Sequence, residues 1–332
     1  MIRFAQFGAG RIGVMHARNI AQEPRASLSH IVDVNATAAR AVADATGAKV
    51  SDRDAALGDP NVDAVLICSA TPTHVDLMLA AAAAGKPVLC EKPIDLDYGR
   101  AKDCVARLSG IDVPVMIGFN RRFDPHHAAL HAAVRNGKIG AVEQVMVTSR
   151  DPGLAPMAYL KESGGIFRDM IIHDFDIVRW LLGEEPVTVS AQGSVLVDPD
   201  VGSIGDFDSA ITTLRTRSGK LAVITNSRRA TYGYDQRMEV LGSDGWVHNG
   251  NVPESLATVW RADGSHGTPL MNFFIERYDA SYRIALNHFI DCVEKGVAPS
   301  VGAIDGLRAL ALAEAADASA RNGGAPTAVD GV

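Results

Sequence analysis

The chain has 332 residues, 47% of them hydrophobic, which is enough for about two domains with sizeable cores. Its 32 basic and 39 acidic residues give a net charge of −7. Because these charges are interspersed, a nucleic-acid binder that uses a basic face is disfavoured. No apolar stretch reaches the ~18 residues that cross a bilayer, and the chain enters a strand pattern without a signal peptide. We expect a soluble, cytoplasmic protein whose four cysteines are free thiols.

The first 120 residues alternate between short apolar runs and alanine-rich segments of helical periodicity. The apolar runs predict strands buried on both faces at 2–7, 28–32, 64–68, 88–90 and 115–118. Helices are predicted between them at 12–21, 36–46, 73–84 and 96–108. Strands and helices that alternate with short connections are typical of an α/β domain with a doubly wound parallel sheet, the Rossmann fold.

After about residue 138 the apolar pattern alternates between successive residues. Strands are predicted at 142–149, 187–197, 208–217, 220–228 and 237–242, and helices at 167–182, 278–295 and 303–321. This pattern indicates an α+β domain with an open, mostly antiparallel sheet. We therefore expect a Rossmann domain at 1–122 and an α+β domain at 123–332. The tail from residue 322, rich in Gly, Ala and Pro, is expected to be loosely held.

A glycine-rich segment follows the first predicted strand and opens the first predicted helix. Gly8, Gly10 and Gly13 match the G-x-G-x-x-G pattern of dinucleotide-binding folds. In this setting Gly8 permits a tight turn, Gly10 lets the backbone approach a pyrophosphate, and Gly13 lets the helix lie close to the sheet. Together with Arg11 and Ile12, these glycines predict a cofactor site at a helix N-terminus.

Asp33 ends the second predicted strand, about 20 residues after Gly13, where an acidic side chain accepts hydrogen bonds from the adenosine ribose. A 2′-phosphate ~4 Å from this carboxylate would be repelled by about 4 kcal/mol at an effective dielectric constant of 20. The cofactor is therefore expected to be NAD. Glycines that serve only the turn, with an Asp33 that merely ends the strand, are the disfavoured alternative, because strand, glycines, helix and acid occur in register.

Polar residues also follow two later strands, at the edge where open α/β sheets bind their ligands. We expect contacts to the cofactor from Ser69, Thr71, His74 and Glu91. Capping of the following helix is an equally good explanation of Thr71. Lys92, beside Glu91, would point toward the nicotinamide end of the site, although a lysine at a strand end is usually a solvated surface residue.

Asp169, His173 and Asp176 recur at spacings of four and three residues, which places them on one face of a predicted helix. A carboxylate beside a histidine can move a proton near neutral pH, because it orients the imidazole and stabilises its charged form. Taken alone, the pattern favours a surface pair worth a few tenths of a kcal/mol. The histidines and carboxylates lack a compact three-ligand spacing, so we expect no metal site.

Five ordered motifs resemble those of the Gfo/Idh/MocA oxidoreductases over nearly the whole chain. They are the Gly8 to Gly13 fingerprint, Glu91-Lys92-Pro93, the segment 118–124, Gly164-Gly165 followed by Asp169 and His173, and Asp305-Gly306-Leu307. Within that family, the segments 149–152, 165–176 and 233–237 resemble those of the inositol 2-dehydrogenases. The resemblance implies an NAD-dependent enzyme that oxidises a ring secondary alcohol of a cyclic polyol.

The resemblance also implies roles for individual residues. Lys92, Asp169 and His173 would form the catalytic group, in which His173 takes the hydroxyl proton, Asp169 orients it and Lys92 holds the oxygen. Substrate hydroxyls would be contacted by Lys92, Arg121, Asp151, Asp169, His173 and Tyr234. With neutral imidazole as the proton acceptor, oxidation is expected to rise as the pH passes through roughly 6.5.

Two other functions remain open. One is a sugar dehydrogenase of the same family that uses NAD or NADP, and the other is a dinucleotide-sensing protein without catalysis. The presence of Lys92, Asp169 and His173 together argues against the second. We expect no nucleic-acid or membrane partner. The open sheet face predicts a homo-oligomer, and the resemblance implies a dimer or a tetramer.

Overall fold

The computed structural model describes residues 1–331, which fall into two compact units. The first unit comprises residues 1–120 and 281–308, and the second comprises residues 121–280 and those from 309 onward. The segment 281–308, assigned by its position in the sequence to the second domain, packs within the first unit. Its Phe289 ring lies 6.1 Å from that of Phe4, and its Asp291 pairs with Arg25.

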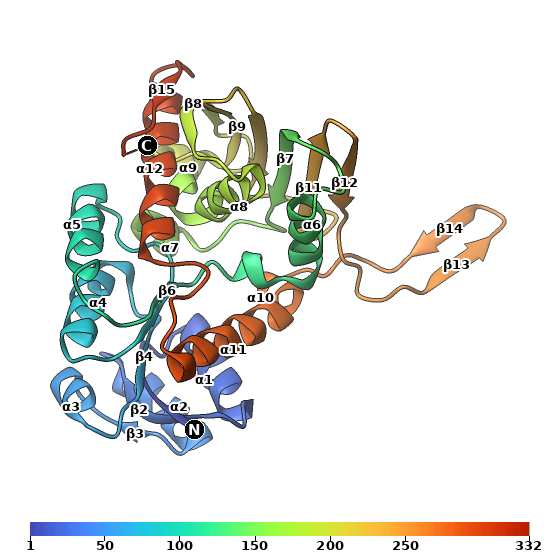
Figure 1. The fold of residues 1–332 in the computed structure, drawn as a ribbon. Helices are drawn as coiled ribbons and strands as arrows, with labels where there is room; N and C mark the ends of the chain where they lie inside the picture. Colours follow the sequence, from blue (N-terminus) through green and yellow to red (C-terminus); the bar gives the residue numbers. More distant parts are fainter. Residues whose placement is uncertain (332) are drawn as a thin grey trace. The chain divides into compact units, whose positions relative to one another are not determined.

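The first unit is built on a six-stranded sheet with the order β3-β2-β1-β4-β5-β6 (Figure 1). Every pairing in this sheet is parallel. The strands are β1 (Ile2–Phe7), β2 (Ala26–Val32), β3 (Lys49–Val50), β4 (Ala64–Ile67), β5 (Val88–Cys90) and β6 (Val115–Ile117). The order reverses between β1 and β4, which is the position where doubly wound sheets bind dinucleotides. The predicted Rossmann sheet is confirmed.

Helices connect these strands, as the alanine-rich periodic segments predict. They are α1 (Arg11–Gln22), α2 (Ala36–Thr46), α3 (Arg53–Gly58), α4 (His74–Ala83) and α5 (Tyr98–Leu108), with a 3₁₀ turn, η1, at Thr71–Thr73. β3 and α3 were not predicted, because two exposed residues and a single helical turn carry too little periodicity.

The second unit contains a seven-stranded sheet with the order β12-β11-β7-β10-β9-β8-β15. Its strands are β7 (Val142–Arg150), β8 (Pro186–Ser194), β9 (Ser209–Thr216), β10 (Leu221–Ser227), β11 (Asp235–Gly242), β12 (Gly245–Asn249) and β15 (Thr327–Ala328). β7 and β10 are parallel, and the other pairings are antiparallel. The mostly antiparallel sheet is therefore confirmed. The expected loose tail is corrected, because β15 hydrogen-bonds to β8.

The remaining elements are α6 (Pro125–Arg135), α7 (Met157–Glu162), a π-helical turn η3 (Phe167–Ile171), α8 (Ile172–Leu182), α9 (Pro199–Ser203), α10 (Phe274–Arg277), α11 (Asp279–Lys295) and α12 (Ala303–Arg321), with a 3₁₀ turn η2 at Asn120–Phe123. A hairpin of β13 (Thr258–Arg261) and β14 (Gly264–Gly267) extends away from the second sheet (Figure 1). None of the helices within residues 1–331 combines the length and apolarity needed to span a membrane.

The second sheet has one buried face and one open face. Alternate residues of β9 and β10 are buried, including Leu214 and Ile224. The opposite face exposes Met146, Ile211 and Leu221 at 48%, 54% and 47%. A hollow of about 610 Å³ lies on this sheet. Side chains of the open face therefore leave a sizeable apolar surface in contact with solvent.

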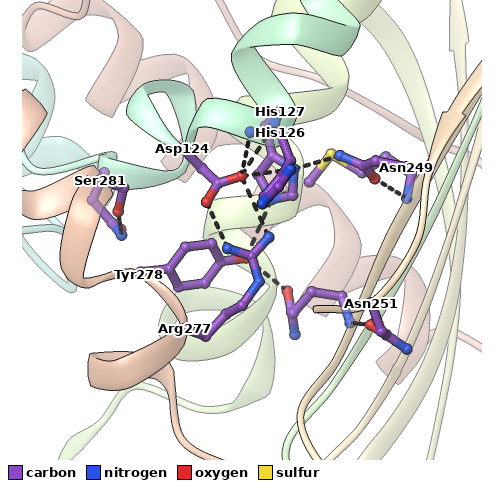
Figure 2. Close-up of polar contacts among 11 residues, drawn as sticks. Asp124, His126, His127, Asn249, Asn251, Arg277, Tyr278 and Ser281 are labelled. Atoms are coloured by element: carbon purple, nitrogen blue, oxygen red, sulfur yellow. Dashed lines mark hydrogen bonds and ion pairs between the residues drawn. The ribbon is translucent and has the colours of Figure 1, made fainter. Parts of the chain in front are cut away.

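A buried polar network anchors α6 (Figure 2). The Asp124 carboxylate caps the helix by accepting from the backbone N–H groups of His126 and His127, and it accepts from Arg277 at 2.6 Å. His127 is fully buried, and burial lowers its pKa to about 3. Asn249 donates its amide to the Nδ1 atom of this neutral ring at 2.7 Å.

The network continues to α8 through uncharged groups and a buried ion pair. The Tyr278 hydroxyl donates to Gln236, whose amide donates to Ser149 at 3.0 Å. Ser149 in turn accepts from Arg121, which binds the Asp174 carboxylate at 2.5 Å. Both charged side chains of that pair are buried, with exposures of 5% and 0%. The pair fixes α8 one residue beyond His173.

Replacing Arg121 with Met should destabilise the protein by about 3–5 kcal/mol, because Asp174 would keep a buried charge without its partner. Chemical denaturation measures this difference. The matched control is Arg53→Met, which removes an exposed ion pair with Asp54 and should cost about 1 kcal/mol or less. Equal losses in the two variants would contradict the role assigned to the Arg121–Asp174 pair.

Candidate active site

The glycine turn after β1 has room for glycine alone at two of its three positions. Gly8 has a φ of 108°, and a Cβ atom there would lie 2.5 Å from the Cys68 carbonyl group. A Cβ on Gly13 would lie 2.3 Å from the Gly8 oxygen. A Cβ on Gly10 would meet no protein atom within 4 Å. The requirement for glycine at position 10 therefore does not come from the protein's own packing.

The N-terminus of α1 is suited to an anion. Gly10 is its N-cap, and no side chain caps the helix, so first-turn N–H groups are available to a ligand. Gln6 is fully buried beneath the turn and donates its amide to the Gly8 and Gly13 carbonyls at 2.8 Å. A braced backbone, a helix N-terminus without a side-chain cap and open space beside Gly10 fit a dinucleotide pyrophosphate.

Asp33 follows β2 and holds this turn as well. One carboxylate oxygen accepts from the Ala9 N–H at 2.6 Å, and the other accepts from the Asn35 N–H at 2.7 Å. The side chain remains partly exposed. Asp33 thus has a bracing role that sequence reasoning did not foresee, and its position at the end of β2 suits ribose recognition.

The loops after β4 and β5 are joined by His74. This residue is 1% exposed, and its ring nitrogens lie 2.8 Å from the Pro93 carbonyl oxygen and 3.0 Å from that of Ser69. Burial lowers the pKa of the imidazole. Because both nitrogens face backbone carbonyls, the geometry favours support of the two loops by His74 over the expected direct contact with a cofactor.

The hydroxyl groups of the same loops are arranged locally. Ser69 and Thr73 share a hydrogen bond of 2.6 Å, and Thr73 also donates to the Ala70 carbonyl. No side chain caps α4, so capping does not explain the threonines before it. Ser69 and Thr71 are partly exposed, and their contact with a cofactor stays a prediction.

Glu91 and Lys92 follow β5. Glu91 accepts from the His16 ring of α1 at 2.8 Å if that nitrogen carries the proton, which couples the loop to the helix that begins at Gly10. A Cβ on Gly118 would lie 2.8 Å from the Glu91 carboxylate, so Gly118 makes room for it. Lys92 is partly exposed and precedes a cis peptide bond to Pro93.

In the second unit, Asp169 lies in a π-helical turn and not in the regular α-helix predicted over 167–182. The turn follows Gly164 and Gly165, whose φ values are 84° and 87°. The Asp206 carboxylate accepts from the Ile166 N–H at 2.9 Å, and a Cβ on Gly165 would lie 3.0 Å from it. Single π turns within helices occur frequently at functional sites.

Two neighbouring side chains hold the Asp169 carboxylate. The Tyr159 hydroxyl donates to Oδ1 at 2.6 Å, and both terminal nitrogens of Arg228 donate to Oδ2 at 3.2 Å. The Arg228 side chain is 3% exposed and that of Asp169 is 12% exposed. Asp169 is therefore a fixed, partly buried carboxylate, which excludes the interpretation of a solvated surface pair.

Asp151 lies beside the same arginine. It follows β7 and Arg228 follows β10, and the two strands run parallel in register, with the Asp151 N–H donating to the Ser227 carbonyl. Burial raises the pKa of Asp151 to about 6, with the nearby Asp169 charge acting in the same direction and Arg228 opposing it. Asp151 therefore changes charge near neutral pH.

Other expected site residues are engaged inside the second unit. Asp176 does not extend the Asp169 and His173 set, because it is buried and pairs with Arg122 at 2.5 Å and 2.8 Å. Arg121 binds Asp174 and is 4% exposed. Tyr234 is 6% exposed and lies edge-on to another tyrosine, Tyr278. Contacts of Arg121 and Tyr234 with a substrate stay predictions.

Tyr159 and Arg228 were not identified from the sequence. Arg228 is one of two adjacent arginines, and its partner lies 59 positions away. Only the pairing of β7 with β10 brings it beside Asp151 and Asp169. In the described chain, residues 1–331, no group of three or more His, Cys, Asp or Glu side chains is arranged to bind a metal.

Family models match both units. Residues 2–119 match the oxidoreductase family with an NAD-binding Rossmann fold, and residues 127–248 match the GFO/IDH/MocA C-terminal domain. The glycine turn, the free N-terminus of α1 and Asp33 all lie within the first match. The expected NAD-binding fold is confirmed.

Similar proteins cover nearly the whole chain. An inositol 2-dehydrogenase of Rhizobium meliloti (strain 1021) is 49% identical over 95% of this chain and 96% of its own. A myo-inositol 2-dehydrogenase of Thermotoga maritima is 45% identical over 96% of each chain. The crystal structure of scyllo-inositol dehydrogenase from Lactobacillus casei with bound NAD(H) and scyllo-inositol superposes with a TM-score of 0.91, at 28% identity, over 99% of each chain. The chain belongs to the Gfo/Idh/MocA family of oxidoreductases.

Proposed function

We propose that the protein is an NAD-dependent inositol 2-dehydrogenase, which oxidises a ring secondary alcohol of myo-inositol or a close isomer to a ketone. The observation that carries this proposal is the full-length similarity, at 45–49% identity, to two proteins named for that reaction. The fixed Asp169 in the π turn that directly precedes the helix of His173 supports it, because oxidation of an alcohol requires removal of the hydroxyl proton.

One set of residues binds the cofactor, and a second set removes the hydroxyl proton. When bound, NAD would supply the acceptor for the hydride of the substrate carbon. The first-turn N–H groups of α1 and the Asp33 carboxylate would hold and orient the dinucleotide. His173 takes the hydroxyl proton, and Asp169 orients the imidazole and stabilises its charged form. Lys92 donates a hydrogen bond to the alcohol oxygen and stabilises the negative charge that develops there.

Asp151, Arg121 and Tyr234 complete the proposed substrate contacts. An ionised Asp151 accepts hydrogen bonds from substrate hydroxyls, and these bonds discriminate against a ring that lacks a hydroxyl at the matching position. Arg121 and Tyr234 are held by buried partners, which suits precise positioning of polar groups toward a rigid polyol.

We also propose that copies of the chain assemble through the open face of the second sheet. This face carries exposed Met146, Ile211 and Leu221, and Met146 and Leu221 line its hollow of about 610 Å³. Apolar faces of this kind are usually covered in an oligomer. The four cysteines are free thiols, which suits a reducing compartment such as the cytoplasm.

The proposed function is tested by a substrate panel. Purified protein is given NAD or NADP with myo-inositol, scyllo-inositol, glucose, galactose or xylose, and the reduced cofactor is followed by absorbance. We expect the highest kcat/KM with an inositol and NAD. Preference for a pyranose would identify a sugar dehydrogenase, and the absence of turnover with saturable NAD binding would favour a sensor.

The two glycines of the turn should separate cofactor binding from folding. Gly10→Ala should weaken NAD binding by about tenfold or more without lowering the melting temperature, because its Cβ meets no protein atom. Gly13→Ala, the matched control, should lower the melting temperature, because its Cβ would lie 2.3 Å from a backbone oxygen. Calorimetry measures both quantities, and normal NAD binding by the Gly10 variant would contradict the proposed site.

His173→Ala should lower kcat by ~10²- to 10⁴-fold, because a positioned general base contributes that much to proton transfer. NAD affinity should stay near normal, since the cofactor-binding residues belong to another unit. Steady-state kinetics measure kcat, and the quenching of protein fluorescence on titration with NAD measures the affinity for the cofactor. A variant with full turnover would show that another group takes the proton.

A further inference from the structure

Arg228 is buried among carboxylates at the end of β10. Its guanidinium donates to Asp169 at 3.2 Å through both terminal nitrogens, and one of these lies 3.9 Å from Asp206. Asp151 leaves the neighbouring parallel strand at the same edge, and its N–H donates to the carbonyl of Ser227, the residue before Arg228, at 2.9 Å. One buried cation therefore serves three acidic side chains. Burying such a cation costs desolvation free energy, which its carboxylate partners offset only when their geometry is favourable.

The three carboxylates differ in what else holds them. Asp206 accepts from the Ile166 and Phe207 N–H groups at 2.9 Å and 2.8 Å, which ties it to the backbone before the π turn. Asp169 has the Tyr159 hydroxyl on its other oxygen. Each of these two carboxylates thus accepts a hydrogen bond from a group other than the arginine.

One nitrogen atom of the guanidinium has no hydrogen-bond partner within residues 1–331. Its Nε atom is buried without a hydrogen-bond partner in the described structure, and the side chain is 3% exposed. A buried donor left without a partner costs about 1–3 kcal/mol. This cost is consistent with an arginine kept for its effect on neighbouring groups and not for stability.

We propose that Arg228 is a positioning residue, which fixes the Asp169 carboxylate in the π turn before the helix of His173 and, by the same charge, keeps Asp151 ionised in the working enzyme. This proposal rests on the proposed function. Tyr159 assists on the Asp169 side only. Arg228 itself need not touch the substrate, because it acts through the two carboxylates.

The charge effect has a definite sign. The groups acting on Asp151 are the cations Arg228 and Arg121 and the carboxylates Asp169 and Asp174. Without Arg228, one of the two cations is lost and both carboxylates remain. The ionised form of Asp151 is then less favourable, so its pKa must rise further above about 6. As the pH is lowered, a variant without Arg228 should therefore lose the activity that needs ionised Asp151 at a higher pH than the wild type does.

The experiment compares Arg228→Gln with Arg228→Lys, Tyr159→Phe and the control Arg229→Gln. Arg229 is the adjacent arginine, is exposed, and donates to a backbone carbonyl away from these carboxylates. The kcat/KM for myo-inositol is measured from pH 5 to 9, together with the dissociation constant for NAD. The pH dependence of the melting temperature is measured without cofactor or substrate.

The acid limb is the fall of kcat/KM on the low-pH side of the profile. For Arg228→Gln we expect its midpoint to lie about one pH unit higher than in the wild type. We also expect kcat to be at least about tenfold lower and NAD binding to be unchanged. Arg228→Lys should restore the acid limb but only part of kcat, because an ammonium cannot reproduce the paired N–H contact. Tyr159→Phe should lower kcat and leave the limb in place. Arg229→Gln should match the wild type.

An unmoved acid limb in Arg228→Gln, or an equal change in Arg229→Gln, would overturn the proposal. If Arg228→Gln does not fold, wild-type kcat in both Arg228→Lys and Tyr159→Phe would overturn it. If the wild type oxidises no inositol, the proposed function fails, and the pH dependence of the melting temperature then tests the effect of Arg228 on Asp151. Ionisation of Asp151 destabilises the fold as pH rises between about 4 and 6, and this fall should extend to higher pH in Arg228→Gln but be absent from Asp151→Asn.

Discussion

Parallel pairing of neighbouring strands is the constraint that gathers the polar residues of each unit. In the first unit β4 and β5 are in register from Val65 with Val88 to Ile67 with Cys90, so the loops that carry Ser69 and Lys92 begin at the same edge. In the second unit β7 and β10 are the parallel pair, and Asp151 and Arg228 leave that edge together. Side chains far apart in sequence are thus brought together without any contribution from local structure.

Buried polar and charged side chains make these edges rigid. In the first unit the buried His74 ring lies between two strand-end loops, with one nitrogen 2.8 Å from the Pro93 carbonyl oxygen and the other 3.0 Å from that of Ser69. In the second, Asp174 and Asp176 are buried on α8 and are met by Arg121 and Arg122. These ion pairs are costly to desolvate, but they fix one orientation of α8. The segment around His173 is therefore held by the same helix turns that carry the buried acids.

The fold of residues 1–120 could be predicted almost completely, because apolar strands and alanine-rich helices repeat in register, whereas nothing in the pattern of 281–308 assigns that segment to the first unit. The second unit was less accessible. Helix α6 was not predicted from the sequence. It carries an N-cap signal, Asp124 followed by Pro125 at the first helical position, but its apolar stripe is weak. The π turn could not be predicted, because it depends on the Gly164-Gly165 turn and on Asp206, which lies 40 positions beyond Ile166. β15 was missed because two residues carry no period.

For the site, local sequence was sufficient for the cofactor and insufficient for the acids. The glycine turn and Asp33 form one compact unit of sequence, so spacing alone locates them. Asp169 and Asp151 look alike in sequence but meet different surroundings. Asp169 has hydroxyl and guanidinium donors on its two oxygens, whereas burial dominates at Asp151 and raises its pKa to about 6. Two carboxyl groups that share one arginine can then serve different purposes, Asp169 as a carboxylate whose position is fixed by its donors and Asp151 as a group that titrates at a pH of about 6. That division follows from strand pairing and burial, which no spacing pattern encodes.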